Sequence, residues 1–171
     1  MDRKKANEVF LRDVYHHYHQ DVYQYCIYLT NNPEEAKDLT QDTFMKALNS
    51  IDQYEGKSNV RTWIMSIARY TTIDYFRKKR YERLLPNKWL SENKSEVFQV
   101  PESDIEKDEE WFRLQKALLK LKENYRQVVI LRALKEFTVS ETAEILGWTE
   151  SKVRVTYHRA IQNMRKKIKH Q

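Results

Sequence analysis

A group of cationic and polar side chains near the C-terminus has the chemistry needed to read duplex DNA. The outward face of one predicted helix carries Arg154, Val155, His158, Arg159, Gln162 and Arg165. Guanidinium groups can bind base edges bidentately or pair with phosphates, and a helix of this kind fits the major groove. The alternative is an ordinary helical hairpin whose charged face is only solvated. Residue types and spacing together favour DNA reading.

A helix–turn–helix pattern across residues 138–169 would position this face. The first helix has an apolar stripe at helical spacing, formed by Val139, Ala143 and Leu146. Gly147 follows the stripe and tolerates the left-handed conformation that ends a helix. Thr149 can cap the second helix through its hydroxyl. The predicted inward face of the second helix comprises Val153, Tyr157, Ala160, Ile161, Met164 and Ile168.

A second candidate site for nucleic acid lies in residues 60–80, where basic and aromatic residues are interleaved. In helical projection Arg61, Arg69, Arg77 and Arg80 fall within about 160° of one another, among Trp63, Tyr70, Tyr75 and Phe76. Aromatic rings can stack on unpaired bases while cations follow the phosphates. The pattern is compatible with binding of a single strand, although such aromatic residues also commonly belong to a hydrophobic core.

Two further helices are predicted before this segment. Residues 7–30 have apolar residues at intervals of three and four. Asn32, Pro33 and Glu35 form a helix start with a capping box, and that helix runs to about Ser50. Its outward face mixes carboxylates with Gln and Met, a composition that suits either a partner protein or solvent. Residues 51–59 form a loop between helices.

Charge divides the chain into three parts. Only 2 Gly and 3 Pro occur in 171 residues, which favours helices. Residues 84–110 lack helical periodicity and carry a net charge of −5, whereas residues 111–171 carry +9. We therefore predict an all-α fold with two small helical domains joined by an extended acidic linker, divided as 1–83, 84–109 and 110–171. Asn124 is predicted to separate the first two helices of the second domain.

Several classes of protein are disfavoured by what the sequence contains. The single cysteine, Cys26, fits a reducing cytoplasm, and no apolar run approaches membrane-spanning length. We expect a cytoplasmic protein without membrane insertion. No catalytic motif, cofactor motif or set of metal ligands is evident, and the closely spaced His16, His17 and His19 lack partners at zinc-ligand spacing. The sequence therefore predicts no enzyme activity, no cofactor and no metal site.

The order of motifs resembles that of the extracytoplasmic-function (group 4) sigma factors of the sigma-70 family. EEAKDLTQDTFMKAL is similar to the family's region 2.1 to 2.2, YEGKSNVRTWIMSIARYTTIDYFRKKR to region 2.3 to 2.4, and ETAEILGWTESKVRVTYHRA to region 4.2. The resemblance implies a promoter-specificity subunit of bacterial RNA polymerase. It also implies that the C-terminal domain binds the polymerase flap, and that an anti-sigma factor, often membrane-bound in this family, holds the protein inactive.

The resemblance also implies three sets of contact residues. The clamp helices of the polymerase large subunit would be bound by Asp38, Leu39, Gln41, Asp42, Phe44 and Met45. The −10 strand of promoter DNA would be bound by Tyr54, Lys57, Ser58, Asn59, Arg61, Trp63, Tyr70 and Arg77. The −35 duplex would be bound by Lys152, Arg154, Val155, His158 and Arg159.

This chain departs from the family pattern on the reading helix. Val155 and Thr156 stand where the family often has Ser and Arg. Val can contact a thymine methyl group but cannot donate a hydrogen bond, so the base sequence that the helix reads is expected to differ. A plain helix–turn–helix regulator, which would bind an operator as a dimer without polymerase, is the alternative function.

Overall fold

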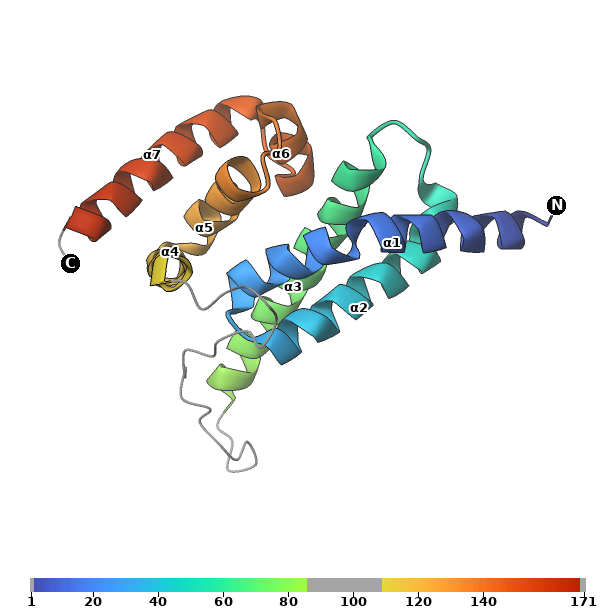
Figure 1. Cartoon of the computed structure of the whole chain (residues 1–171), viewed down its shortest axis with the longest axis horizontal. Coiled ribbons are helices and arrows are strands. Elements are labelled where there is room, and N and C mark those ends of the chain that lie inside the picture. Colours follow the sequence, from blue (N-terminus) through green and yellow to red (C-terminus); the bar gives the residue numbers. More distant parts are fainter. Residues whose placement is uncertain (1, 86–108, 170–171) are drawn as a thin grey trace.

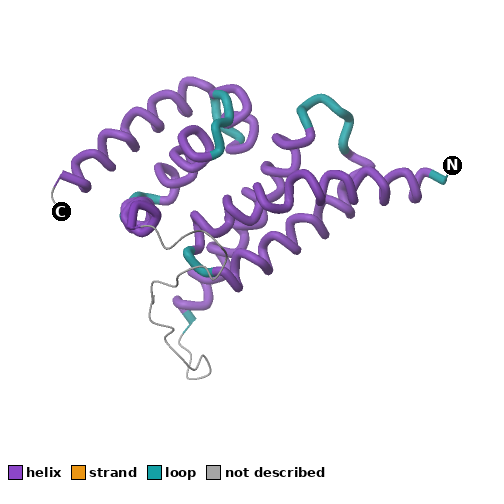
Figure 2. Tube along the Cα trace, viewed as in Figure 1, coloured by secondary structure: helices purple, strands orange, loops and turns teal. Residues whose placement is uncertain are grey.

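The computed structural model describes residues 2–85 and 109–169, and these form helices joined by short loops (Figures 1 and 2). The first unit contains α1 (Arg3–Thr30), α2 (Pro33–Ser50), a 3-10 turn (Ile51–Gln53) and α3 (Val60–Leu84). The second contains α4 (Glu109–Leu119), α5 (Glu123–Val129), a π-helical turn (Ile130–Leu134), α6 (Val139–Leu146) and α7 (Glu150–Lys169). The predicted all-α class with two small helical domains is confirmed. Most of the predicted acidic linker lies outside the described residues.

The first unit is a bundle of three helices, with α1 and α2 joined by a tight turn. Asn31 ends α1 in the left-handed conformation, with φ of 51°. The Asn32 side chain accepts hydrogen bonds from the backbone N–H groups of Glu34 (3.0 Å) and Glu35 (3.2 Å), as an N-cap should. The predicted capping box is not completed, because the Glu35 carboxylate pairs instead with Lys79 of α3 at 3.1 Å.

In the second unit, α6 and α7 form the predicted helix–turn–helix. Gly147 has φ of 64°, and the Thr149 hydroxyl accepts a hydrogen bond from the backbone N–H of Lys152 at 3.2 Å. The sequence-based prediction missed a full capping box at the start of α6, where Thr138 and Glu141 bond each other's backbone N–H. The capping box fixes the start of α6, and Gly147 with Thr149 fixes the turn into α7.

The break between α4 and α5 falls at residues 120–122, so the predicted division at Asn124 is wrong by a few residues. The physical reason is Arg126, whose guanidinium donates to the carbonyl oxygens of Leu118 (3.0 Å), Leu119 (3.0 Å) and Leu121 (3.2 Å). A cation that binds the last carbonyls of a helix stabilises its end there. The helix therefore ends where Arg126 can reach it.

The two units lie against each other and share a continuous hydrophobic core. Helix α3 packs on α6, and the C-terminal part of α1 contacts α4. The shared core runs from Val22, Leu29 and Ile64 in the first unit to Leu118 and Phe137 in the second. Among the described helices, none has an apolar stretch long enough to cross a membrane.

Candidate nucleic-acid interface

Helix α7 presents the predicted DNA-reading face to solvent. The exposed residues there are Lys152, Arg154, Val155, His158 and Arg159. The opposite face holds the helix in place, because Val153 and Ala160 are fully buried. The inward face is shorter than predicted, since Ile168 is 58% exposed near the end of the helix, where little of the second unit remains to cover it.

Neighbouring residues restrain the basic side chains of this face. The Arg154 guanidinium forms an ion pair with Glu150, one turn earlier, at 2.9 Å. The Lys152 ammonium lies 4.3 Å from the centre of the Trp148 ring, within cation–π range. Val155 is 49% exposed between the cations and offers an apolar surface to a ligand. Two of the basic side chains on this face thus have a neighbouring partner, while Val155 stays open to a ligand.

The loop before α3 is held by an aromatic cluster. Tyr54 donates a hydrogen bond from its hydroxyl to the carbonyl oxygen of Ser58 at 2.7 Å, which closes the loop on itself. The Tyr54 ring lies 4.7 Å from the ring of Trp63 and 6.0 Å from that of Phe10. Lys57 is exposed and pairs with Glu55. Tyr54 and Ser58 are therefore held next to Trp63, whereas Lys57 projects from the loop.

Helix α3 carries a row of three predicted −10 residues on one face. Trp63, Tyr70 and Arg77 recur every seven residues, so they lie almost in line along the helix. Tyr70 is 62% exposed, and the Lys46 ammonium of α2 lies 5.5 Å from its ring centre. Arg77 is exposed and paired with Asp74. Tyr70 and Arg77 therefore form an exposed aromatic and basic surface beside α2, and the partly buried Trp63 lies at the N-terminal end of the row.

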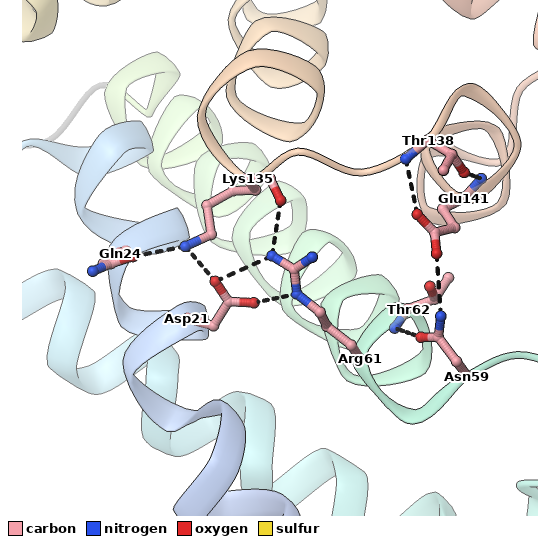
Figure 3. A network of polar contacts seen from close by, with 8 residues as sticks. All are labelled: Asp21, Gln24, Asn59, Arg61, Thr62, Lys135, Thr138 and Glu141. Atoms are coloured by element: carbon pink, nitrogen blue, oxygen red, sulfur yellow. Dashed lines mark hydrogen bonds and ion pairs between the residues drawn. The ribbon is translucent and has the colours of Figure 1, made fainter.

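Arg61 does not belong to this row. It precedes Trp63 by two residues, so it points to nearly the opposite side of α3, toward the second unit. Its guanidinium donates to Asp21 of α1 at 2.8 Å and to the carbonyl oxygen of Lys135 at 2.8 Å (Figure 3). The guanidinium carbon also lies 4.0 Å from the ring centre of Phe137. The predicted −10 residues therefore do not form a single patch.

Asn59 is engaged by the second unit as well. Its side-chain oxygen caps α3 by accepting from the backbone N–H of Thr62 at 2.8 Å, while its side-chain nitrogen donates to Glu141 of α6 at 3.1 Å (Figure 3). Backbone and side-chain hydrogen bonds from Thr138 lower the pKa of the Glu141 carboxyl, and Asn59 adds to this effect. Glu141 therefore keeps its negative charge where it meets Asn59.

The ionic cluster around Asp21 was not predicted from the sequence. Burial alone raises the pKa of this carboxyl, but hydrogen bonds and Coulomb attraction from Arg61 and Lys135 outweigh burial and leave the pKa below its usual value. The Lys135 side chain is only 6% exposed and also donates to Gln24 at 2.7 Å. Its partners lie more than 100 positions away in the chain, so no local pattern could have indicated the contact.

The exposed surface of α2 contains four of the six residues predicted to bind polymerase. Asp38, Gln41, Asp42 and Met45 are exposed, and Met45 keeps 59% of its surface. Leu39 and Phe44 are 3% and 7% exposed, since they fill the core of the first unit. These two predicted contact residues therefore do not belong to the exposed surface of α2 in this conformation. Their periodicity already places them on the inward stripe.

Models of two protein families match the chain. The model of Sigma-70 region 2 matches residues 14–81, and that of Sigma-70 region 4 matches residues 111–164. Together they cover most of the sequence and include part or all of each described helix. The chain belongs to the sigma-70 family. Sigma factors are transcription initiation factors that take RNA polymerase to promoter DNA, and the predicted function as an alternative sigma factor is confirmed.

Curated relatives indicate the group within the family. The sigma factor is 37% identical over 161 residues to the RNA polymerase sigma factor YlaC of Bacillus subtilis, covering 92% of this chain and 91% of the relative. It is 34% identical to the ECF RNA polymerase sigma factor SigX of the same organism, covering 90% and 80%. The predicted membership of the extracytoplasmic-function group is thereby confirmed.

Solved structures share the fold of the sigma factor. One is the sigma factor RpoE of Bartonella quintana in complex with the anti-sigma factor NepR, with a TM-score of 0.76, 23% identity, and coverage of 92% of this chain and 96% of that one. Another is CnrH in complex with the cytosolic domain of CnrY, with a TM-score of 0.73, 20% identity, and coverage of 98% and 92%. At this identity the likeness supports the fold alone.

Proposed function

We propose that this sigma factor divides promoter recognition between its two helical units. In this proposal residues 110–171 form a domain that anchors at the −35 duplex and binds the polymerase flap. Residues 1–83 form a domain that binds the clamp helices of the polymerase large subunit and captures the −10 strand. Residues 84–109 link them. The protein acts in the cytoplasm, where polymerase and promoter DNA meet.

The exposed face of α7 is the observation that carries the proposal. Arg154, Val155, His158 and Arg159 share one side of a helix whose other side is fixed by buried residues and by a glycine-terminated turn. Arg154 and Arg159 would bind base edges or phosphates, while Val155 would contact a thymine methyl group. Lys152, near the start of the helix, is placed to bind a phosphate.

The row on α3 supports strand capture by the first unit. Each base stacked on an aromatic ring contributes about 1 to 3 kcal/mol, which is close to the few kcal/mol that unstacking a base costs. Trp63 and Tyr70 would supply two such surfaces, with Arg77 bound to a phosphate of the same strand. The loop of Tyr54, Lys57, Ser58 and Asn59 would hold a base flipped from the duplex. Arg61 would join this set once its contacts with the second unit, the Lys135 carbonyl oxygen and the Phe137 ring, are displaced.

Helix α2 would bind polymerase through its exposed surface. Asp38, Gln41, Asp42 and Met45 combine charge with one large apolar side chain, a composition that suits a protein interface with an apolar centre and a polar rim. We expect Met45 to contribute most of the apolar contact and the carboxylates to fix the register.

An anti-sigma factor is proposed as the regulator. One solved structure that shares this fold contains an anti-sigma factor, and in another the partner is a cytosolic domain. For this chain we propose a membrane-bound anti-sigma factor whose cytosolic segment covers the exposed surface of α2. Binding of this segment and binding of core polymerase should be mutually exclusive in a competition assay, and Met45→Ala should weaken both; simultaneous binding of the two partners would contradict this step.

Run-off transcription with bacterial core RNA polymerase and genomic fragments tests the proposed function. Transcripts that require the sigma factor are expected. Arg159→Ala should weaken the −35 footprint, and Tyr70→Ala should lower permanganate reactivity of −10 thymines while the footprint remains. Arg113→Ala, an exposed arginine of α4 away from both faces, is the matched control. Binding to duplex fragments without polymerase, with no association with core, would instead support an operator-binding regulator.

A further inference from the structure

The contact between the two units is made by residues that the first unit would need for DNA. Asn59 donates its side-chain amide to Glu141, and Arg61 donates to the backbone carbonyl of Lys135 (Figure 3). A carboxylate and a carbonyl oxygen are hydrogen-bond acceptors, as are phosphate oxygens and base-edge carbonyls. The second unit thus presents to Asn59 and Arg61 the kind of acceptor that a promoter strand would present.

Lys135 of the second unit stabilises this contact through bonds to α1. Its ammonium forms an ion pair with Asp21 and a hydrogen bond with Gln24 at 2.7 Å, both on α1. The side chain is nearly buried, and the same Asp21 carboxylate also holds Arg61. A buried cation is stable only beside its ion-pair partner. When the units separate, the Lys135 ammonium leaves Asp21 and must be hydrated instead. The Asp21–Arg61 pair lies within the first unit and can persist after separation.

A second group of bonds joins the units at the C-terminal end of α1. The Gln115 amide donates to the carbonyl oxygens of Ile27 and Tyr28, each at 3.2 Å, and Arg126 donates to that of Leu29 at 3.3 Å. The last carbonyls of a helix have no partner within the helix, and α1 has no basic residue in its last turn. The second unit therefore caps a helix of the first.

The closed arrangement cannot bind both promoter elements at once. Elements centred at −10 and −35 are about 25 base pairs apart, or roughly 85 Å along B-form DNA. In the structure Asn59 lies 3.1 Å from Glu141, within the helix–turn–helix itself. The 23 residues of 86–108 can extend to about 76 Å, so the covalent connection permits the units to separate once their contacts break.

We propose that the contacts of Lys135 with Asp21 and of Glu141 with Asn59 form an autoinhibitory latch, in which the second unit occupies the −10 strand's binding groups until promoter DNA displaces it. The latch closes the free sigma factor without any anti-sigma partner. Its regulatory consequence rests on the proposed function of Asn59 and Arg61 in strand capture, whereas closure itself does not.

The latch leaves part of the proposed −10 surface open. The row of Trp63, Tyr70 and Arg77 faces away from the second unit, and Tyr70 is largely exposed. A single strand can therefore bind the row weakly first and then compete for Asn59 at the N-terminal end of α3. This order of events predicts that opening the latch raises affinity for a −10 single strand without creating a new binding surface.

Lys135→Met in the full chain tests the latch, because it removes the buried cation and leaves every proposed DNA-binding residue in place. Lys116→Met, at an exposed lysine of α4, is the matched control. Small-angle X-ray scattering should give a larger radius of gyration for Lys135→Met than for wild type or control. Amide exchange at residues 59–61 and 138–141 should rise, and affinity for a −10 single-stranded oligonucleotide should increase about tenfold, as expected when one charged contact is lost.

The two readouts separate the latch from the proposed function. An unchanged radius of gyration and unchanged exchange for Lys135→Met would overturn the latch, whatever the oligonucleotide result. A larger radius without tighter oligonucleotide binding would support closure but overturn the occupation of a DNA site, and with it the proposed role of Asn59 and Arg61. Transcription assays with Tyr70→Ala test strand capture independently of either result.

Discussion

The end of α1 permits a sharp test of how the two units hold together. Gln115 is fully buried, and its amide nitrogen donates to two carbonyl oxygens at the C-terminal end of that helix. Gln115→Glu preserves size and shape but replaces the donor with a carboxylate. The new charge would face helix carbonyls that together carry about half a negative charge. The guanidinium of Arg126 is bonded to the carbonyl oxygens of Leu118, Leu119 and Leu29.

The expected cost follows from these contacts. Two hydrogen bonds contribute about 1 kcal/mol each, and an uncompensated buried charge costs about 3 to 5 kcal/mol. The sum of about 5 to 7 kcal/mol is comparable to the whole stability of a small domain. We therefore expect Gln115→Glu to separate the units at pH 7 rather than bury the charge. Gln115→Met, which loses the two bonds without adding charge, should cost about 2 kcal/mol.

Closure of the Gln115→Glu variant should depend on pH, and the sign of this dependence can be predicted. In the Gln115→Glu variant, burial and the nearby carbonyl oxygens would raise the pKa of the introduced carboxyl when the units are closed. Closure of this variant is then favoured below the raised pKa and lost as pH rises through it. Scattering and amide exchange should show open units at pH 7 and partial closure near pH 5, with no such change in Gln115→Met. If the Gln115→Glu variant stays as closed as wild type at pH 7, the argument from buried charge is wrong.

Three further predictions concern other parts of the molecule. The pKa of the Asp21 carboxyl is lowered in the closed form. The contribution of this carboxylate to closure is therefore complete above its usual pKa, about 3.9, and is lost as pH falls through the lowered value. Scattering of the wild-type protein should detect opening in acid, and Asp21→Asn should remove this transition. Gly147→Ala should destabilise the second unit by about 1 kcal/mol, measured by thermal denaturation, because Gly147 has a positive φ that alanine adopts poorly, and no loss would contradict this account. Val155→Ser should abolish discrimination between thymine and uracil at one −35 position. In the wild type, burial of the thymine methyl group corresponds to about 0.8 kcal/mol of this discrimination. Equal discrimination by both proteins in competition binding would exclude the proposed contact.

Local sequence determined most of the helical framework. The start of α2 at Asn32, the turn at Gly147 and the cap at Thr149 each depend on bonds within a few residues, so residue type and spacing were sufficient to predict them. The exposed face of α7 followed from helical periodicity for the same reason. The inward positions of Leu39 and Phe44 were equally present in the periodicity, and only the assignment of polymerase contacts by resemblance put them on the surface.

Tertiary structure alone decided which predicted DNA-binding residues are available. Periodicity grouped Arg61 with the other arginines of its helix, yet the second unit covers Arg61 and leaves the face of Tyr70 open. The ion pair between Asp21 and Lys135 joins side chains more than 100 positions apart, and neither residue belongs to a motif. Such a contact depends on how two preformed units dock, which is determined by the complementarity of whole surfaces rather than by the neighbours of any residue in the chain.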